Sequence, residues 1–386
     1  MSVHRVPESK GGGWEVRWRQ HSRQRSKRFH DKDLADIFAA DLRKRRRLGT
    51  LDDLDAGTEL LSDWGRVWRE KRAKVRLAAS TLNRYEQVWD LWVLPYLGEY
   101  ELREIDVGVA DDYMADLHDA ECGLETQRKA LYLLQAVLGY AVRRRRIPYN
   151  PMLSFDKPRG RRRAVKPLPL TAIETMIASL PPRDSVLTEL MAYQGLRPGE
   201  ALALTDTSIR DRTLLVESNI SLGEEKDTKT HRIRTVNFLR PVPQDLAAYR
   251  LGTRRDRVAG CPLLFPRPDG NPWRDTNYRN WRRRVFRPAA VAAGIATSTV
   301  KRLPDGSKRR RYNGPRPYDL RHTFVSLLIQ EGRSIAYVAE QAGHTVEECA
   351  RTYTHLFDEY RDARPVQAED LIQRARARVA HGRAAL

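Results

Sequence analysis

The sequence is poor in cysteine and has no long apolar run. Its three cysteines, Cys122, Cys261 and Cys349, lie far apart and lack C-x-x-C or Cys/His ligand spacing, which argues against a disulfide framework and a zinc site. No apolar stretch approaches the roughly 20 residues of a membrane-spanning helix, and the polar residues 3–13 do not resemble a signal peptide. We therefore expect a soluble, intracellular protein with no membrane partner.

Lysine is scarce in the second half of the chain. Beyond residue 167 the only lysines are Lys226, Lys229, Lys301 and Lys308, because arginine supplies most of the positive charge there. Arginine cannot give up a proton at neutral pH, whereas lysine can, so few residues of this region could act as a cationic general acid. Acidic clusters with metal-ligand spacing are also lacking, and we expect neither a metal nor another cofactor.

What the sequence has in excess is positive charge. It contains 70 Lys and Arg against 50 Asp and Glu, a formal net charge of +20 and an isoelectric point near 10.1. The first 50 residues alone hold 14 basic and 6 acidic side chains. A solvated basic surface is the plain explanation, but this concentration favours a polyanionic partner such as DNA.

Residues 1–55 are predicted to form a small basic DNA-binding module. Residues 14–19 alternate apolar and charged side chains, as a half-buried strand does. A second short strand is expected at residues 27–30 and a helix at residues 33–48, ending in five consecutive basic residues. Residues 52–57 are acidic and turn-like, and we place the first domain boundary there.

Residues 58–156 carry helical periodicity and are predicted to form a helical-bundle DNA-binding domain. Apolar stripes indicate helices at residues 60–68, 82–92, 106–118 and 126–146, with Ser80 as a candidate N-cap. Their aromatic residues are expected in the core rather than as base-stacking platforms. Residues 157–167, basic and rich in Pro and Gly, form a linker, either a solvated tether or a segment that follows the phosphate backbone.

From residue 168 the pattern mixes helices and strands, and residues 168–365 are predicted to form an α+β catalytic domain. We expect a helix capped by Thr171, another at residues 186–193, strands at 213–216 and 234–238, and a basic hairpin or loop at 300–316. Residues 366–386 form a tail with a short helical pattern. The fold class is therefore multidomain and mainly α, with small β-sheets.

Four motifs in this region resemble those of the tyrosine recombinases, the lambda-integrase family. Residues 192–202, A-Y-Q-G-L-R-P-G-E-A-L, resemble the first arginine box, and residues 318–323, Y-D-L-R-H-T, resemble the second. Q-A-G-H at 341–344 and T-Y-T-H-L at 352–356 are similar to the two elements that follow. One box alone is weak evidence, but four in the family's order and spacing are specific.

The resemblance implies a site-specific DNA recombinase that forms a covalent 3′-phosphotyrosine without metal or ATP. Tyr353 would be the nucleophile, and Arg197 and Arg321 would hold the nonbridging phosphate oxygens. His344 would donate a hydrogen bond to the phosphate or orient the tyrosine. Lys229 would protonate the leaving 5′ oxygen, with Lys226 as its rival.

One position departs from the family pattern. The second box usually begins with histidine, where this chain has Tyr318. A phenol is a poor base at neutral pH, so we predict that Tyr318 donates a hydrogen bond and does not take the proton from Tyr353. His322 and His355 match no catalytic role of the family and are interpreted as structural.

The first hypothesis is an integrase of a phage or other mobile element, with residues 1–55 as its arm-binding module. It would act on core and arm attachment sites as a homotetramer assembled on DNA, aided by a DNA-bending protein and an excision factor, in the bacterial cytoplasm at the nucleoid. The alternatives are an Xer-like dimer resolvase, a catalytically silent DNA-binding regulator of the same fold, and a topoisomerase. The tail either docks on a neighbouring subunit or is a solvated basic helix.

Overall fold

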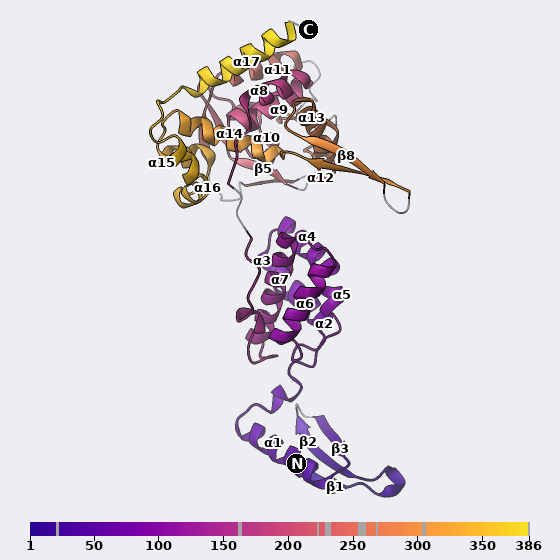
Figure 1. Ribbon diagram of the computed structural model, residues 1–386. Coiled ribbons are helices and arrows are strands. Elements are labelled where there is room, and N and C mark those ends of the chain that lie inside the picture. Colours follow the sequence, from indigo (N-terminus) through magenta and orange to yellow (C-terminus); the bar gives the residue numbers. More distant parts are fainter. Residues whose placement is uncertain are drawn as a thin grey trace. The chain divides into compact units, whose positions relative to one another are not determined.

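The computed structural model describes residues 1–20, 23–160, 164–221, 224–227, 233–253, 260–267, 269–302 and 306–384. The chain divides into two compact units, Met1–Arg161 and Arg162–Leu386, and each is described by itself. Both consist mainly of helices with small antiparallel sheets (Figure 1), which confirms the predicted fold class. No helix in the described ranges is long and apolar enough to cross a membrane.

The first unit begins with a three-stranded antiparallel sheet covered by one helix. Its elements are β1 (Ser2–Arg5), β2 (Trp14–Gln20), β3 (Arg23–Phe29) and α1 (Lys32–Arg47), and the strand order is β1-β2-β3. The alternation in β2 places Val16 and Trp18 on the inner face, where they pack with Leu42 of α1 in a small core. Asp31 caps α1 by accepting a hydrogen bond from the backbone N–H of Asp33 at 2.7 Å.

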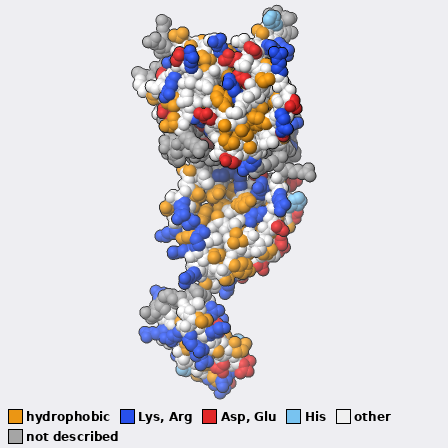
Figure 2. All heavy atoms as spheres, turned by 90° about the vertical axis from the view of Figure 1, so that its left-hand side faces the viewer, with side chains coloured by type: hydrophobic (Ala, Val, Ile, Leu, Met, Phe, Trp, Pro, Cys, Tyr) orange, Lys and Arg blue, Asp and Glu red, His pale blue; other side chains and the backbone are white. Residues whose placement is uncertain are grey.

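The outer surface of this small domain is strongly basic. The side chains of β3 are exposed from Arg23 to Arg28, and α1 ends in Lys44, Arg45, Arg46 and Arg47. Figure 2 shows Lys and Arg side chains over much of the visible face of this domain. Cations near a helix C-terminus are also favoured by the helix dipole, so this charge stabilises α1 and can also attract a polyanionic ligand.

The rest of the first unit is a helical bundle around its own core. Its elements are α2 (Leu61–Trp68), α3 (Lys74–Arg76), α4 (Ala79–Val88), α5 (Leu94–Leu97), α6 (Val107–Asp119) and α7 (Leu124–Arg143), with π-helical turns at Arg69–Ala73 and Trp89–Val93. The longest helix, α7, buries Ala130, Leu134, Val137 and Ala141 at helical spacing. Trp64 is buried and stacks on Tyr140 with ring centroids 5.6 Å apart, as expected for a core aromatic.

Two predicted helix caps were wrong. Ser80 lies inside α4, whose N-cap is Ala78, and Thr171 lies inside α8 (Leu170–Ser179), whose N-cap is Pro169. Neither N-cap residue makes a side-chain capping hydrogen bond, because alanine and proline have no side-chain acceptor. The hydroxyl-bearing residue nearest the apolar run was therefore a misleading signal for where the helix starts.

The second unit holds nine more helices and six strands in the described residues. After α8 come α9 (Pro182–Tyr193), α10 (Pro198–Leu202), α11 (Val242–Thr253), α12 (Asp275–Trp281), α13 (Arg287–Ala292), α14 (Pro317–Gln330), α15 (Ile335–Ala342), α16 (Val346–Glu359) and α17 (Ala368–Ala384). The strands are β4 (Thr213–Val216), β5 (Ser218–Ser221), β6 (Glu224–Asp227), β7 (Arg234–Asn237), β8 (Thr297–Arg302) and β9 (Lys308–Asn313). They pair as β4-β7, β5-β6 and β8-β9. The last pair is the predicted basic hairpin.

Two helices form the centre of this unit. In α9 every residue from Val186 to Tyr193 is buried, and α14 is buried almost throughout from Leu320 to Ile329. A helix that is buried all round must lie inside the domain. The functional residues at the ends of α9 and α14 are thus held by the rigid interior of the fold.

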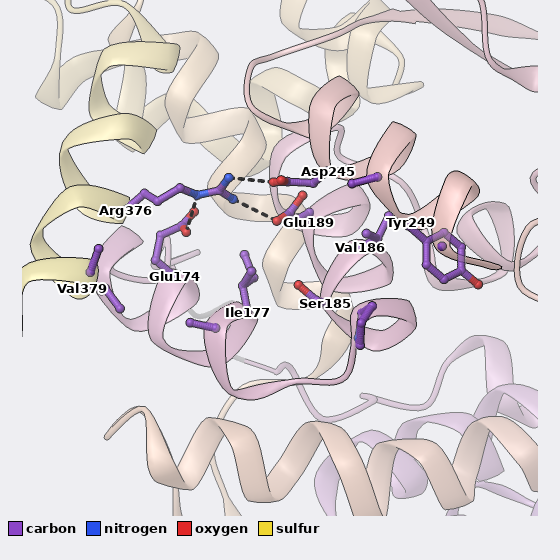
Figure 3. Close-up of a pocket in the computed structure, with 14 residues that line it drawn as sticks. Glu174, Ile177, Ser185, Val186, Glu189, Asp245, Tyr249, Arg376 and Val379 are labelled. Carbon is purple, nitrogen blue, oxygen red and sulfur yellow. Dashed lines mark hydrogen bonds and ion pairs between the residues drawn. The ribbon is translucent and has the colours of Figure 1, made fainter. Parts of the chain in front are cut away.

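The C-terminal helix α17 packs against α8 of the same chain. Its Ala368, Ile372 and Ala375 are buried, so the predicted alternative of a free, solvated tail is wrong for this conformation. Arg376 reaches the carboxyl groups of three acidic side chains (Figure 3). Its Nε donates to Glu174 at 2.9 Å, its Nη1 to Asp245 at 2.6 Å and its Nη2 to Glu189 at 2.9 Å.

Candidate active site

Arg197 stands at the start of a short helix. α9 ends at Tyr193, and Gly195, with a φ of +61°, turns the chain back. Arg197 then occupies the N-cap of α10. Glu200 accepts one hydrogen bond from the backbone N–H of Arg197 at 2.9 Å and another from its Nη1 at 2.7 Å. The R-x-x-E spacing therefore fixes the position of the guanidinium.

Glu200 also binds a second arginine. Both of its oxygens accept from Arg234 on β7, at 3.0 Å from Nη1 and 2.7 Å from Nη2. Burial alone would raise the pKa of this carboxyl, but the hydrogen bonds and charge of Arg234, together with the charge of Arg197, lower the pKa of Glu200 to about 2. Glu200 is therefore ionised at neutral pH and holds two guanidiniums side by side.

Arg321 is a fully buried cation in the first turns of α14. Its side chain is 0% exposed, and its Nη1 donates to the carbonyl oxygen of Gly195. Burial, with the like charges of Arg197 and Arg234, lowers the pKa of Arg321 to about 10, so the guanidinium stays protonated at neutral pH. Such a cation needs an anion, because burying unpaired charge is costly.

His344 follows directly after the left-handed C-cap of α15. Gly343 has a φ of +64°, and its carbonyl oxygen accepts a hydrogen bond from Nη2 of Arg197 at 3.0 Å. The Nε2 of His344 lies 3.0 Å from Nη2 of Arg321. Burial, with the charges of Arg321 and Arg197, lowers the pKa of His344 to about 3. The ring is thus neutral, with Nε2 as acceptor and the proton on Nδ1.

Tyr353 lies on α16 and is covered by its neighbours. The residue is 1% exposed, and its ring stacks beside that of His344 with centroids 6.0 Å apart. Its hydroxyl lies 2.7 Å from Nδ1 of His322 on α14. Burial raises the pKa of Tyr353, while the charge of Arg321 opposes that rise. The hydroxyl is a neutral phenol at pH 7.

Tyr318 lies one helical turn before His322 on α14. The two rings meet edge to face with centroids 5.6 Å apart, as residues four apart on a helix do. Within the described part of the chain its hydroxyl has no hydrogen-bond partner. The predicted donor role of Tyr318 therefore stays a prediction.

The structure brings five of the six predicted site residues into one network of contacts. Contacts join Arg197 to the residue before His344, His344 to Arg321 and Tyr353, and Tyr353 through one histidine to Tyr318. The sixth, Lys229, lies outside the described residues, in the gap between β6 and β7. Its role stays a prediction.

Three residues of this network were not among the predicted site residues. Glu200 and Arg234 hold Arg197 in place, and His322 contacts the hydroxyl of Tyr353. The R-x-x-E spacing was a usable signal for Glu200. No local signal pointed to Arg234 or His322, because their partners lie 34 and 31 residues away in the sequence.

The arrangement can bind an anion next to a potential nucleophile. Arg197 is partly exposed, and two buried nitrogen atoms, Nε of Arg321 and Nδ1 of His344, have no hydrogen-bond partner within the described ranges. Buried donors without partners are rare in proteins and suit a ligand that brings acceptors. A tetrahedral oxyanion offers several acceptor oxygens to such a set.

The region that holds these site residues matches a protein-family model. The model described as "Phage integrase family" matches residues 168–360, half of the chain, which include Arg197, Arg321, His344 and Tyr353. The chain belongs to the phage integrase family. A second model, "Phage integrase, N-terminal SAM-like domain", matches residues 60–117 of the helical bundle.

Curated relatives of this phage integrase family member include Xer recombinases. Tyrosine recombinase XerC of Alcanivorax borkumensis is 26% identical over 289 residues, which cover 73% of this chain and 85% of the relative. Tyrosine recombinase XerD of Shewanella oneidensis is 23% identical over 269 residues, which cover 68% and 81%. The protein is thus related to tyrosine recombinases over most of their length.

Solved structures of integrases share the fold. The Tn1549 transposon integrase in complex with transposon right end DNA has a TM-score of 0.62 at 17% identity, covering 79% of this chain and 98% of that one. A lambda integrase dimer bound to a COC′ core site has a TM-score of 0.61 at 15% identity, covering 94% and 95%. A lambda integrase tetramer bound to a Holliday junction has a TM-score of 0.57 at 14% identity, covering 90% and 94%.

Proposed function

We propose that this protein is a site-specific DNA recombinase that integrates a mobile element through a covalent 3′-phosphotyrosine intermediate. The observation that carries the proposal is the burial of Tyr353 next to the His344–Arg321 pair, whose arginine also donates to the carbonyl of Gly195 in the first arginine box. Family membership supports the same reaction class. The mobile-element role is favoured by the basic domain at residues 1–55, which suits a second set of DNA sites.

In the proposed reaction two guanidiniums hold the scissile phosphate. Arg197 and Arg321 are cations at neutral pH and present planar donor groups to the nonbridging oxygens, and Nδ1 of His344 adds a neutral donor. Charge builds on these oxygens as Tyr353 attacks, so fixed donors stabilise the attacked state more than the substrate. Removing one such donor is expected to slow cleavage by about 10²- to 10³-fold.

Lys229 is the proposed general acid for the leaving 5′ oxygen. The proposal rests on the sequence, where Lys229 stands between the predicted strands and lysine is rare. Its ammonium can give up a proton, which a guanidinium cannot do at neutral pH. Loss of this group is expected to cost roughly 10²- to 10⁴-fold in rate. Lys226 remains the rival.

The site must open before it acts on DNA. Arg321 and Tyr353 are almost fully covered by protein in this conformation, so a phosphate reaches them only after neighbouring elements shift. DNA binding would supply the energy for this opening.

The proposed partners are core and arm DNA sites and three further copies of the chain on DNA. The DNA-bound Tn1549 and lambda integrase structures and the lambda tetramer support this assembly, and a DNA-bending protein and an excision factor are proposed in addition. The Xer relatives favour a second candidate, the resolution of chromosome or plasmid dimers. The basic domain at residues 1–55 favours the integrase, since core cleavage alone does not need it.

A nicked suicide substrate tests the proposal. Duplexes cut from the DNA that flanks the coding region are incubated with the wild-type chain, Tyr353→Phe and Tyr360→Phe. Wild type and Tyr360→Phe should form a covalent, protease-sensitive complex at equal rates, because Tyr360 only accepts a hydrogen bond from Gln330. Tyr353→Phe should form none. A covalent complex with Tyr353→Phe contradicts the proposed nucleophile.

A further inference from the structure

The hydroxyl of Tyr353 has a nitrogen base as its hydrogen-bond partner. Nδ1 of His322 lies 2.7 Å from it, and the two rings are tilted by 60° with centroids 5.7 Å apart. We infer that His322 is a catalytic residue: it accepts the proton of Tyr353 as the tyrosine attacks DNA, the task for which Tyr318 is unsuited. The inference rests on the proposed function.

The position of His322 explains how it can take over this task. Residues 318 and 322 are four apart on α14, so they share one face of the helix one turn apart. The tyrosine at 318 leans its ring edge against the histidine. The imidazole therefore sits one turn further along the same helix face than the histidine with which the second box usually begins, and there it meets the nucleophile on α16.

Other groups near the hydroxyl are poor proton acceptors or, like the Glu348 carboxylate, make no hydrogen bond to it in the described part of the chain. Arg197 and Arg321 are protonated, and the lone pair of His344 Nε2 already faces the Arg321 guanidinium. Burial raises the pKa of the Cys349 thiol to about 11, so it carries its own proton at neutral pH. Within the described residues, His322 Nδ1 is the single hydrogen-bond partner of the Tyr353 hydroxyl.

His322 has the protonation state that a base needs. Burial lowers its pKa to about 4; the nearby Asp319 carboxylate opposes this fall, and Arg321 and Arg316 add to it. A neutral imidazole has two tautomers, and in the one that carries its proton on Nε2 the Tyr353 O–H donates to Nδ1. In that tautomer, which the proposed step uses, the lone pair that receives the proton points at it.

The proposed step balances atoms and charges. The Oη–H bond of Tyr353 breaks as the Oη–phosphorus bond forms, and the proton passes to Nδ1 of His322, which becomes imidazolium. The bond from phosphorus to the 5′ oxygen breaks, and Lys229 supplies a proton to that oxygen. In the rejoining step the 5′ hydroxyl attacks phosphorus and returns its proton to Lys229, the Oη–phosphorus bond breaks, and His322 returns its proton to Tyr353. Negative charge on the attacked phosphate favours the imidazolium.

Asparagine and alanine at position 322 separate proton transfer from positioning. The amide oxygen of His322→Asn can accept a hydrogen bond near the place of Nδ1 but cannot take up a proton. Both variants should form the covalent complex about 10²- to 10⁴-fold more slowly than wild type on the nicked suicide substrate. Cleavage by His322→Asn within about threefold of wild type would show that the residue only positions Tyr353, and would overturn the inference.

A sulfur leaving group separates the base from the acid. When sulfur replaces the bridging 5′ oxygen, the thiolate leaves without a general acid, so Lys229→Ala should regain near wild-type cleavage. His322→Asn should stay slow on this substrate, because the tyrosine must still lose its proton. Full rescue of His322→Asn by the sulfur substrate would show that His322 acts in protonating the leaving oxygen, as a general acid does, and would contradict the inference.

Controls keep the two proposals apart. His355→Gln is the control variant, because His355 lies on α16 two residues after Tyr353 but contacts the carbonyl of Val165 instead of the nucleophile, and it should cleave like wild type. Thermal unfolding of each variant checks that the fold is intact. If wild type and Tyr353→Phe form the same amount of covalent complex, the recombinase proposal fails. If they differ but His322→Asn cleaves as fast as wild type, only the present inference fails.

Discussion

Arg197 donates a hydrogen bond of 3.0 Å to the carbonyl oxygen of Gly343, 146 residues further along the chain. Gly343 directly precedes His344, so this bond ties the first arginine box to the third motif through the backbone. The left-handed φ of Gly343 turns its carbonyl out of α15 and makes it available. The proposed catalytic groups are therefore aligned partly by main-chain geometry, which side-chain chemistry alone does not reveal.

The ionised state of Glu200 should make a large contribution to stability. Its side chain is 2% exposed and accepts from Arg197 and Arg234. Glu200→Gln leaves two guanidiniums without their anion, and we expect a loss of about 3–5 kcal/mol in the free energy of unfolding at pH 7. Urea unfolding followed by circular dichroism measures it.

The pH dependence gives the sign of this effect. The pKa of Glu200 is lowered to about 2 in the folded state from 4.5, so its stabilisation is complete above pH 4.5 and is lost as the pH falls towards 2. The difference between wild type and Glu200→Gln should shrink over that window. Asp211→Asn, at an exposed pair with Arg212, should change stability by less than about 0.5 kcal/mol. A pH-independent difference at Glu200 would contradict the assignment.

The turn at Gly195 should tolerate no side chain. A Cβ there would lie 2.2 Å from a ring carbon of Phe324, and the φ of +61° is unfavourable for alanine. Gly195→Ala should cost roughly 2–5 kcal/mol through strain and overpacking, and it should displace the carbonyl that accepts from Arg321. Gly294→Ala is the control: its φ is +74° but nothing lies within 4 Å. Equal losses of stability in the two variants would show that Phe324 does not crowd the turn.

Arg376 should hold the C-terminal helix in place. Arg376→Ala removes the cation that Glu174, Glu189 and Asp245 share (Figure 3), and we expect a loss of about 3–5 kcal/mol in the free energy of unfolding. Arg376→Lys keeps the charge without the fork-shaped donor set, and its free energy of unfolding should lie between those of wild type and Arg376→Ala. Arg378→Ala, exposed on the same helix, should stay within about 0.5 kcal/mol of wild type.

Glu189 in this cluster should destabilise the fold as the pH rises. Burial and the neighbouring Asp245 raise its pKa to about 9, although Arg376 opposes the rise, so the folded protein holds a proton there that the unfolded chain releases above about pH 4.5. Stability from this group is present at low pH and is lost between pH 4.5 and 9. Glu189→Gln should therefore become more stable relative to wild type as the pH rises through this window. A constant difference would show that Glu189 is an ordinary ion-pair partner.

The basic N-terminal domain should determine the salt dependence of arm-site binding. Each phosphate neutralised adds about −0.9 to the slope of log affinity against log salt concentration. Deleting residues 1–55 should flatten this slope on DNA that contains arm sites and leave it unchanged on core-site DNA. Fluorescence anisotropy over a range of salt concentrations measures both, and an equal slope on arm DNA would remove the arm-binding role.

Five of the predicted site residues lie together because several of their motifs stand at element ends that the local sequence fixes. The R-x-x-E cap at Arg197 and the glycine before His344 are local signals, and α16 has an amphipathic helical pattern. The contact between His322 and Tyr353 could not be predicted, since it depends on how α14 packs against α16. A tertiary contact of this kind has no periodicity in the sequence.

Short polar strands were the other omission. β1 and the pair β5-β6 were not predicted, because each has four residues and little apolar alternation. β1 pairs with β2 in register from Ser2 opposite Arg17, and backbone hydrogen bonds hold it there together with one partly buried side chain, that of Val3. β4, by contrast, has a buried alternate face and was located at its true bounds.

The near-complete burial of Tyr353 lowers the apparent affinity of the site for DNA and limits cleavage at non-specific sequences. If the form with Tyr353 exposed is populated only to a small fraction, the apparent affinity for a cleavable phosphate falls by that fraction. Non-specific duplex DNA binds too weakly to shift the population towards the exposed form, whereas a specific site adds enough contacts to shift it. On the proposed function, the protein would therefore bind non-specific DNA without cutting it and would cleave only at a site whose contacts stabilise the exposed form.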